Sequence, residues 1–360
     1  MGTKLKIVTI IGARPQFIKA ATVSRQLKSH ADEILVHTGQ HYDKNLSAVF
    51  FHELDIPNPS YNLGVGSGTH GVQTGEMLAK IEAVLIEEAP DWVIVYGDTN
   101  STLAGALAAA KLNIKVAHVE AGLRSFNRQM PEEINRILTD HISDMLFCPS
   151  DVAVKNLADE GITQNVHIVG DVMGDSLAYA AEKAKLHSNI VRELGVKAGN
   201  YYLVTVHRAE NTDNQHRLRN ILKAFSDLDE KVIFPIHPRT KQALETYHID
   251  VNQLSSNIEF IAPVGYLDMV QLEQSAKMIL TDSGGIQKEA YWLRVPSVTL
   301  RDETEWVETT QSGWNVLAGA DKDKILATVR NFQMPKEHPN LYGIGQTGEK
   351  IVDYLLQYYK

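Results

Sequence analysis

The feature that most constrains this fold is an alternation that runs through the whole sequence. Short apolar runs of strand length, such as residues 6–11, 33–37 and 92–96, alternate with longer amphipathic stretches of helical period. This alternation is typical of βαβ units, so it predicts an α/β fold with parallel sheets. With 360 residues the chain is too long for one ordinary core, so we expect two Rossmann-like domains.

Charge and composition exclude several classes of protein. The 35 basic and 44 acidic side chains give a formal net charge of −9, which argues against a nucleic-acid-binding protein but still allows a local basic pocket. Cys148 is the only cysteine, so we expect no disulfide framework and no cysteine-rich metal site. The N-terminus runs directly into a strand instead of a signal peptide, and no apolar run is long enough to cross a membrane. We therefore expect a cytoplasmic protein that binds no membrane.

Basic residues follow the first strand, residues 6–11. Arg14 lies in the turn and Lys19 one helical turn later, with Pro15 suited to the first turn of the helix. Open α/β sheets bind ligands at the carboxyl ends of their strands. A helix start usually favours acidic residues, so basic ones there suggest an anionic ligand, although a solvated helix end is the alternative.

Acidic residues follow the next strands. Asp98 comes after residues 92–96, and Glu120 comes after residues 115–119. A glutamate at the end of a buried strand is costly unless it has a partner or a chemical role. Glu132 and Glu133 lie in the first turn of the helix that Pro131 begins. Two alternatives stay open: Asp98 only caps the next helix, and the two glutamates only complement a helix dipole.

The second half repeats the pattern with imidazole, guanidinium and glycine. Strand 201–206 is followed by His207 and Arg208, and strand 231–236 by His237. The strand that begins at Met278 runs into Ser283, Gly284 and Gly285, and a helix carrying Glu289 follows. Amides at such a helix start attract anions, and glycines let a ligand approach closely. The alternative is an ordinary turn between a strand and a helix.

Familiar cofactor motifs are missing or unconvincing. Residues 66–71 match the dinucleotide pattern G-x-G-x-x-G, but no strand is expected to run into them and no acidic residue follows at the required distance in a βαβ unit. We interpret this segment as a loop that closes over a ligand. There is no Walker loop and no H-E-x-x-H zinc helix. Basic groups that hold a diphosphate and carboxylates that move protons suit a nucleotide-sugar substrate.

Five motifs in order resemble the non-hydrolysing UDP-N-acetylglucosamine 2-epimerases over nearly the whole chain. They are Gly12-Ala-Arg-Pro-Gln-Phe-Ile-Lys19, Gly97-Asp-Thr99, His118-Val-Glu-Ala-Gly-Leu-Arg124, Met130-Pro-Glu-Glu-Ile-Asn-Arg136 and Thr281-Asp-Ser-Gly-Gly-Ile-Gln-Lys-Glu289. The resemblance implies a fold of the glycosyltransferase-B type with an interdomain cleft. The expected domains are residues 1–172, residues 173–345, which bind UDP, and a C-terminal helix, 346–360, that packs back on the first domain.

The resemblance also implies a reaction and a set of roles. Such enzymes eliminate UDP across C1–C2 of the sugar to give a glucal and add it back with the opposite configuration at C2, for cell-surface polysaccharide precursors. It assigns acid, base and charge-stabilising roles to Asp98, Glu120 and Glu132, and proton transfer or diphosphate contact to His207. It assigns UDP binding to the remaining basic and loop residues, with Glu289 on the ribose: Arg14, Lys19, Arg208, His237, Ser283, Gly284, Gly285 and Glu289. A UDP-sugar substrate, no cofactor and a homodimer are implied.

Two departures from the family pattern concern substrate and activation. Glu305-Trp-Val-Glu308 replaces Glu-Arg-Pro-Glu, and Gln40-His41-Tyr42 replaces Gln-His-Arg, which helps form an activator site in many bacterial members. Together with Gln16 and Phe17, these variants are more similar to the branch that acts on UDP-2,3-diacetamido-2,3-dideoxyglucuronate. A hydrolysing epimerase, a glycosyltransferase of the same fold and a non-catalytic nucleotide-sugar sensor remain alternatives.

Overall fold

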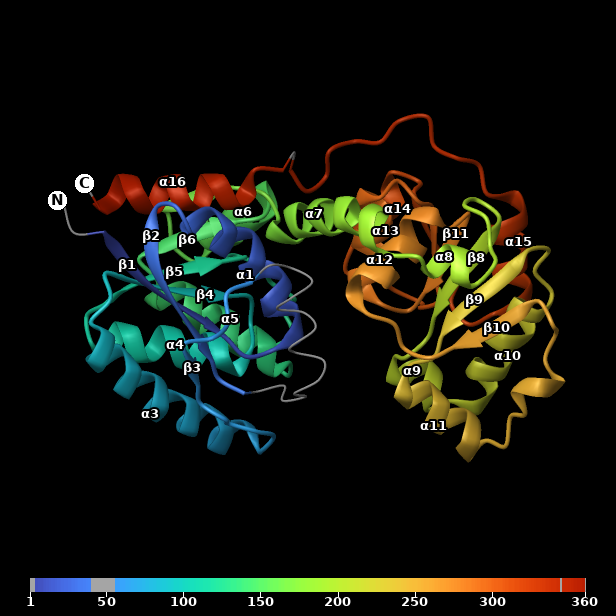
Figure 1. Ribbon diagram of the computed structural model, residues 1–360, viewed down its shortest axis with the longest axis horizontal. Coiled ribbons are helices and arrows are strands. Elements are labelled where there is room, and N and C mark those ends of the chain that lie inside the picture. The colour runs from blue at the N-terminus through green and yellow to red at the C-terminus, as the bar shows by residue number, and fades with distance from the viewer. Residues whose placement is uncertain (1–3, 40–55, 344, 360) are drawn as a thin grey trace. The chain divides into compact units, whose positions relative to one another are not determined.

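The computed structural model describes residues 4–39, 56–343 and 345–359, and they fold into two compact units (Figure 1). Unit 1 comprises Met1–Ser176 and Tyr342–Lys360, and unit 2 comprises Leu177–Leu341. Helix α7 (Val172–His187) carries the chain from the first unit into the second. The chain therefore leaves unit 1 once and returns to it for its last residues.

Unit 1 is built on a parallel sheet. Its seven described strands follow the order β3-β2-β1-β4-β5-β6-β7. The strands are β1 (Leu5–Ile11), β2 (Ala31–His37), β3 (Tyr61–Asn62), β4 (Trp92–Tyr96), β5 (Lys115–Val119), β6 (Met145–Cys148) and β7 (Val166–Ile168). Its described helices, besides the start of α7, are α1 (Arg14–Leu27), α3 (His70–Glu88), α4 (Asn100–Lys111), α5 (Pro131–Ile142), α6 (Asp151–Asp159) and α16 (Thr347–Tyr359).

Unit 2 repeats this architecture with six described strands in the order β10-β9-β8-β11-β12-β13. The strands are β8 (Tyr201–Thr205), β9 (Lys231–Pro235), β10 (Ile258–Ile261), β11 (Met278–Thr281), β12 (Ser297–Thr299) and β13 (Asn315–Leu317). After α7 the helices are α8 (Ile190–Glu193), α9 (Ala209–Thr212), α10 (Gln215–Ser226), α11 (Pro238–Thr246), the 3-10 turn η1 (Val251–Gln253), α12 (Tyr266–Ser275), α13 (Gly284–Trp292), α14 (Val307–Gln311) and α15 (Lys322–Asn331). The predicted parallel sheets and the alternation of strands with helices are confirmed.

The turn from β1 into α1 is fixed by a buried amide. Gln16 accepts hydrogen bonds from Gly12 N at 2.8 Å and Ala13 N at 3.0 Å, and donates to the Tyr96 carbonyl of β4 at 2.8 Å. A side chain at Gly12 is excluded, because its Cβ would lie 2.1 Å from Thr38 Oγ1. The first and fourth strands of unit 1 are therefore held together where both end.

Helix α16 packs on unit 1 although it follows unit 2 in the chain (Figure 1). Tyr354 stacks on His167 of β7 with ring centroids 3.9 Å apart, and Tyr358 meets Trp92 of β4 edge-on at 5.7 Å. Leu355 is fully buried beside them. These aromatic and aliphatic contacts tie the last helix to two strands of the sheet.

The sequence-based expectations differ from the structure in a few elements. The short edge strands β3 and β13 were not expected, because two or three residues give little periodic signal. Contrary to expectation, β3 precedes the glycine-rich segment 66–71, and α3 begins at His70. Cβ atoms built on Gly66, Gly68 and Gly71 meet no described atom within 4 Å, unlike the tightly packed glycines of a dinucleotide turn. No helix in the described part of the chain is long and apolar enough to span a membrane.

Candidate active site

Both sheets place the candidate residues where the strand order reverses. In unit 1 the chain adds strands outward from β1 on one side and from β4 on the other, and in unit 2 the same reversal falls between β8 and β11. Ligands of open α/β sheets bind at the carboxyl ends of such neighbouring strands. The residues after β1, β4, β8 and β11 therefore lie where open α/β sheets bind ligands.

Lys19 and Glu120 form an ion pair in unit 1. The Lys19 ammonium contacts a Glu120 carboxylate oxygen, and the two side chains are only 13% and 11% exposed. Burial alone would lower the pKa of Lys19, but the charges of Glu120 and Asp98 outweigh it and raise the pKa. Glu120 has a left-handed backbone with φ +73°, a conformation that non-glycine residues rarely adopt. This turn takes Glu120 out of the alternation of β5, which ends at Val119.

Asp98 is held by the start of α5. Its carboxylate accepts a 2.6 Å hydrogen bond from Arg136, and its backbone carbonyl accepts one from Asn135 at 2.9 Å. The carboxyl group is 36% exposed, so a ligand can reach it. The alternative that Asp98 serves only as a cap is wrong, because Thr99 caps α4 by accepting a hydrogen bond from Thr102 N.

The two acids at the start of α5 have different surroundings. Glu133 is buried and accepts hydrogen bonds from Ser125 N, Ser125 Oγ and Phe126 N at 2.8–2.9 Å. Burial would raise the pKa of Glu133, but these donors and the Arg136 charge lower it. Glu132 is exposed. Glu133 thus fixes the loop before α5, and Glu132 is the acid that stays accessible.

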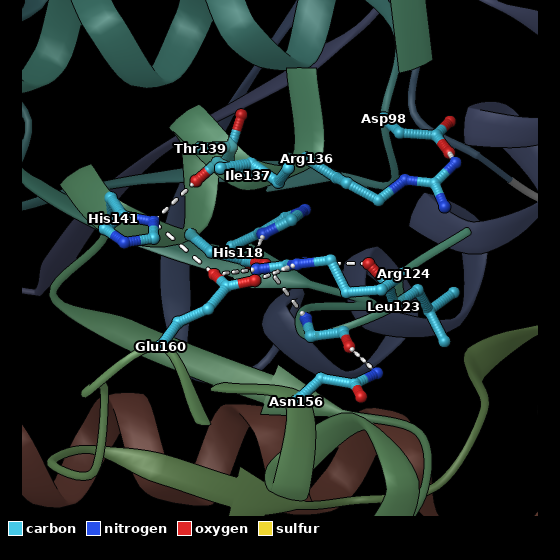
Figure 2. A network of polar contacts seen from close by, with 12 residues as sticks. Asp98, His118, Leu123, Arg124, Arg136, Ile137, Thr139, His141, Asn156 and Glu160 are labelled. Carbon is cyan, nitrogen blue, oxygen red and sulfur yellow. Dashed lines mark hydrogen bonds and ion pairs between the residues drawn. The ribbon is translucent and has the colours of Figure 1, made fainter. Parts of the chain in front are cut away.

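A network of buried charges joins β5, the loop after it and α5 (Figure 2). His118 Nδ1 lies 2.7 Å from Asp140 Oδ1, and Asp140 Oδ2 accepts from Arg124 at 2.7 Å. Arg124 also donates two 2.7 Å hydrogen bonds to the two oxygens of Glu160. Burial would raise the pKa of Asp140, but His118 and Arg124 hold it below its ordinary value. Asp140 is therefore an anion at neutral pH.

In unit 2 a buried carboxylate organises the loops after β8 and β11. Asp282 is fully buried and accepts hydrogen bonds from His207 N at 3.0 Å, Arg208 N at 2.9 Å and the Asn211 amide at 3.1 Å. The loop that carries His207 and Arg208 is thereby fastened to the residue just before Ser283. Asp282 was not among the predicted site residues. Its position at the end of a buried strand is the signal that points to a role, because a buried acid there is costly without partners.

Two imidazole rings from neighbouring strands lie beside this carboxylate. His207 and His237 have ring centroids 5.2 Å apart, and His207 Nδ1 is 3.6 Å from Asp282. Burial lowers the pKa of His207, and Asp282 offsets this only in part, with the charges of His237, Arg208 and Arg239 adding to the lowering. His237 is the N-cap of α11 and accepts from Arg239 N at 3.1 Å. His207 is thus neutral near pH 7.

Helix α13 begins at Gly284, directly after Ser283, as the sequence predicts for a strand, turn and helix. The first amides of any helix lack partners within it, and the helix dipole favours an anion there. Gly285 is exposed, and a Cβ there would meet only Ser283 Oγ at 3.8 Å. Gly284 is buried, and a Cβ there would lie 2.6 Å from Glu305 Oε1. Glu289 is buried one turn into the helix and accepts from Tyr266 Oη at 3.2 Å. The buried Glu273 nearby has a pKa well above its ordinary value because of burial and the Glu289 charge.

The variant loop at residues 305–308 lies next to this helix. Trp306 stands where the resemblance leads us to expect an arginine, and the Lys288 ammonium lies 4.2 Å from the centroid of its ring. Glu305 pairs with Arg301 at 2.8 Å. The lysine against the indole therefore places a cation in this region although the expected arginine is absent.

Two predicted features lie outside what the structure describes. Arg14 begins α1, but its side chain is not among the described ones. Gln40-His41-Tyr42, the segment expected to bear on activation, lies outside the described residues. Two sets of contacts were not predicted from the sequence. They are the pairing of Arg136 with Asp98 and the network of His118, Asp140 and Arg124. Within the described ranges, no three His, Cys, Asp or Glu side chains cluster as metal ligands would.

Comparison with known proteins decides the family. Residues 25–356 match the family model described as UDP-N-acetylglucosamine 2-epimerase. The chain belongs to the UDP-N-acetylglucosamine 2-epimerase family. This is a family of isomerases, and our sequence-based recognition of it is confirmed.

Individual members of the UDP-N-acetylglucosamine 2-epimerase family are similar to this chain over its full length. A UDP-N-acetylglucosamine 2-epimerase homolog of Methanococcus maripaludis is 57% identical, covering 98% of this chain and 99% of its own. The UDP-2,3-diacetamido-2,3-dideoxy-D-glucuronate 2-epimerase of Pseudomonas aeruginosa is 48% identical, with coverage of 98% and 99%. The crystal structure of Methanocaldococcus jannaschii UDP-N-acetylglucosamine 2-epimerase, in complex with UDP-N-acetylglucosamine and UDP, is 46% identical with a TM-score of 0.84, covering 99% of this chain and all 100% of that one. The expected fold, of the glycosyltransferase-B type, is confirmed.

Proposed function

We propose that this protein interconverts UDP-N-acetylglucosamine and UDP-N-acetylmannosamine without hydrolysing them. The observation that carries the proposal is the pair of carboxylates at the ends of β4 and β5, Asp98 and Glu120, each held by a cationic partner. A protein that only binds nucleotide sugars needs no such carboxylates. Membership of the epimerase family supports the same reaction.

The reaction is an elimination followed by an addition. One carboxylate removes the proton from C2 of the sugar as the C1–O bond breaks, and UDP leaves with the bonding electrons. The product is a glucal with a C1–C2 double bond. UDP oxygen then adds back to C1 while a proton is delivered to the other face of C2. No electrons are gained or lost, so the reaction needs no redox partner.

Unit 1 supplies the groups suited to the proton steps. General acid–base catalysis requires carboxylates that can change protonation state within reach of the substrate. Asp98 and the exposed Glu132 are accessible, and Glu120 lies against the Lys19 ammonium. Lys19 and Arg14 add positive charge, which stabilises a departing diphosphate.

Unit 2 supplies the groups suited to UDP. The α13 amides with Ser283, Gly284 and Gly285 favour the diphosphate, and Glu289 favours a ribose hydroxyl. Asp282 holds the His207 and Arg208 amides in place beside them. With its lowered pKa, neutral His207 is suited to accept or donate a proton at the leaving diphosphate. The exposed side chains of His237 and Arg208 are two further groups suited to contact the diphosphate.

A second substrate, UDP-2,3-diacetamido-2,3-dideoxyglucuronate, is the alternative. The Trp306 variant favours it, and the 48% identity to the P. aeruginosa enzyme is compatible with it. Gln16 and Phe17 bear on it less, because both are buried and act as scaffold: Gln16 fixes the turn after β1, and Phe17 packs on His37 with centroids 5.1 Å apart. These two residues therefore indicate similarity to that branch, but they have no described contact that would distinguish the two sugars.

Proton NMR in D2O tests reaction and substrate together. Each UDP-sugar is incubated with the protein, and we expect deuterium to enter at C2 while a new anomeric signal of the epimer appears. Free N-acetylmannosamine with UDP would instead identify a hydrolysing epimerase. Turnover only after addition of an acceptor sugar would identify a glycosyltransferase. Binding without exchange at C2 would leave a nucleotide-sugar sensor.

We also propose that the protein acts as a cytoplasmic homodimer. Helix α5 turns its polar residues inward, including the buried Glu133, Asn135 and Asp140, and leaves Ile134 and Leu138 exposed on its outer face. Exposed apolar side chains one helical turn apart are suited to an interface with a second copy. Sedimentation analysis of the wild type and of Leu138→Glu tests this, with a shift from dimer to monomer expected for the variant.

A further inference from the structure

The ring of His118 lies between two acceptors. It is fully buried on β5, with Nδ1 2.7 Å from Asp140 Oδ1 and Nε2 2.7 Å from the Gly97 carbonyl oxygen. A carbonyl oxygen can only accept a hydrogen bond, so Nε2 must donate. Asp140 already accepts from Arg124 and from Gly122 N at 3.2 Å, as an ionised carboxylate does. Both ring nitrogens therefore donate, which requires a doubly protonated, positively charged ring.

The charges around the ring support this state. Asp140 from α5 faces the ring directly, and the lowered pKa of Asp140 keeps it ionised despite burial. On the far side of Asp140, Arg124 is clamped by both oxygens of Glu160, and His141 lies 3.8 Å from Glu160. Cys148 from β6 is neutral, since burial and the Asp140 charge raise the pKa of its thiol to about 12. The network alternates cation and anion.

The ring holds the turn that carries Asp98. Its Nε2 donates to the carbonyl of Gly97, the residue just before Asp98, and Gly97 is left-handed with φ +63°. A Cβ on Gly97 would lie 3.2 Å from the Lys19 ammonium and 3.4 Å from Glu120. The turn after β4 is therefore fixed close to the Lys19–Glu120 pair.

The same ring also holds the turn that contains Glu120, and it does so by way of the Asp140 carboxylate. Asp140 accepts from the amide of Gly122, two residues after Glu120, and both residues are left-handed with φ +79° and +73°. A side chain at Gly122 is excluded, since its Cβ would lie 2.4 Å from the Ala153 carbonyl. Two unusual turns at the ends of adjacent strands thus share one buried support.

We propose that His118 is a positioning residue of the epimerisation: its charged ring fixes the Gly97–Asp98 turn against the Glu120–Gly122 turn. The role rests on the proposed function, because positioning matters only if the two carboxylates act on one sugar carbon. An apolar core would stabilise the sheet at a lower desolvation cost than this network of buried charges. Stability alone therefore does not explain the network. Positioning at this level affects the chemical step far more than the binding of UDP.

The first test compares two buried neighbours of one sheet. His118→Gln keeps a donor for only one acceptor and removes the charge, whereas Leu146→Ala removes core packing at the residue that pairs with His118 on β6. We expect His118→Gln to lower kcat about 100-fold while KM and the Kd for UDP stay within about threefold. We expect Leu146→Ala to lower the melting temperature at least as much but to keep kcat within about threefold of wild type. Equal losses of kcat in the two variants, or unimpaired His118→Gln, would overturn the positioning role.

The second test needs no variant. Neutron diffraction from crystals of the deuterium-exchanged wild-type protein should show deuterium on both ring nitrogens of His118. One deuterium on the ring would overturn the proposal even if His118→Gln fails to fold.

Wild-type protein that exchanges C2 of neither UDP-sugar would overturn the proposed function and the positioning role with it. Normal wild-type exchange with normal His118→Gln exchange would overturn the positioning role alone.

Discussion

Glu120 shows how one residue combines strain with charge. Its left-handed backbone is rare for a residue with a Cβ, and its carboxylate is buried against Lys19. Such backbone strain persists only where surrounding contacts enforce it, and it is frequent at functional sites. The ammonium beside it holds the carboxylate in one direction. If Glu120 is the proposed base, it is therefore oriented before the substrate arrives.

We expect Glu120→Gln to keep UDP binding and to lose most turnover. The amide is nearly isosteric but cannot take up a proton, so kcat should fall by about 10²–10⁴-fold. Steady-state kinetics and titration calorimetry with UDP measure the two effects separately. Glu82→Gln, an exposed acid on α3, is the matched control and should leave both unchanged. Near-normal kcat in Glu120→Gln would remove Glu120 from the mechanism.

The buried Glu133 should make stability depend on pH. Its folded-state pKa lies below the ordinary value of 4.5, so its stabilisation is complete above pH 4.5 and is lost as pH falls through the folded-state value. At pH 7 we expect Glu133→Gln to lower the free energy of unfolding by about 2 kcal/mol, the contribution of hydrogen bonds to a charged acceptor. Urea unfolding at several pH values should show this difference shrinking below pH 4.5. Glu132→Gln, the exposed neighbour, should show no such pH-dependent difference, and a constant difference for Glu133→Gln would contradict the assignment.

At the scale of elements, Asp282 joins the start of α13 to the loop after β8. The carboxylate accepts three backbone or amide donors from the β8 side and directly precedes the turn that starts α13. A buried charge with all its hydrogen bonds satisfied rigidifies the segments that it joins. The helix start is therefore set by the sheet, and its first amides are ordered before a ligand binds.

The two glycines of α13 should respond differently to alanine. A Cβ on Gly285 meets only Ser283 Oγ at 3.8 Å, so Gly285→Ala should fold with unchanged or slightly higher stability, since alanine favours helix. The added methyl group would nevertheless obstruct a diphosphate on the helix start, and we expect the Kd for UDP to rise about tenfold or more. Gly284→Ala, which meets Glu305 at 2.6 Å, should also lose stability. Calorimetry and thermal unfolding check both, and an unchanged Kd in Gly285→Ala would place UDP elsewhere.

At the scale of the whole molecule, the chain is discontinuous in one unit and continuous in the other. Unit 2 is a single segment, whereas unit 1 is completed by residues 342–360. Leu355 and the aromatic rings of α16 contribute buried apolar surface to the first unit only as long as this helix is docked. Stability of the N-terminal half is therefore encoded partly at the other end of the sequence.

We expect Leu355→Ala to destabilise unit 1 and to spare unit 2. Leu355 is fully buried, so its truncation should cost about 2–5 kcal/mol. Hydrogen exchange followed by mass spectrometry should show faster exchange in peptides of β4, β6 and β7, with unit 2 unchanged. Leu222→Ala, at a buried position of α10, is the control and should have the opposite distribution. Uniform acceleration after Leu355→Ala would show that the units unfold together.

Much of the fold followed from local patterns, whereas the contacts of the site did not. β4 and β5 have the predicted bounds, and α1 and α5 begin where proline fits a first helical turn. The candidate acids were found because charge at a buried strand end is costly wherever the partner lies. Arg136, His118 and Asp140 were missed as a group because their pairings join residues 22 to 38 positions apart. Spacing along one chain does not encode such pairings between a strand end and a helix.

The return of the chain to unit 1 has a consequence for biosynthesis. A polypeptide that emerges from the ribosome N-terminus first can finish unit 2 while the earlier unit still lacks α16. The strand ends that carry Asp98 and Glu120 thus belong to a half that is started first and closed last. Newly made molecules would complete the unit that carries these two proposed proton-transfer groups only when the last helix docks.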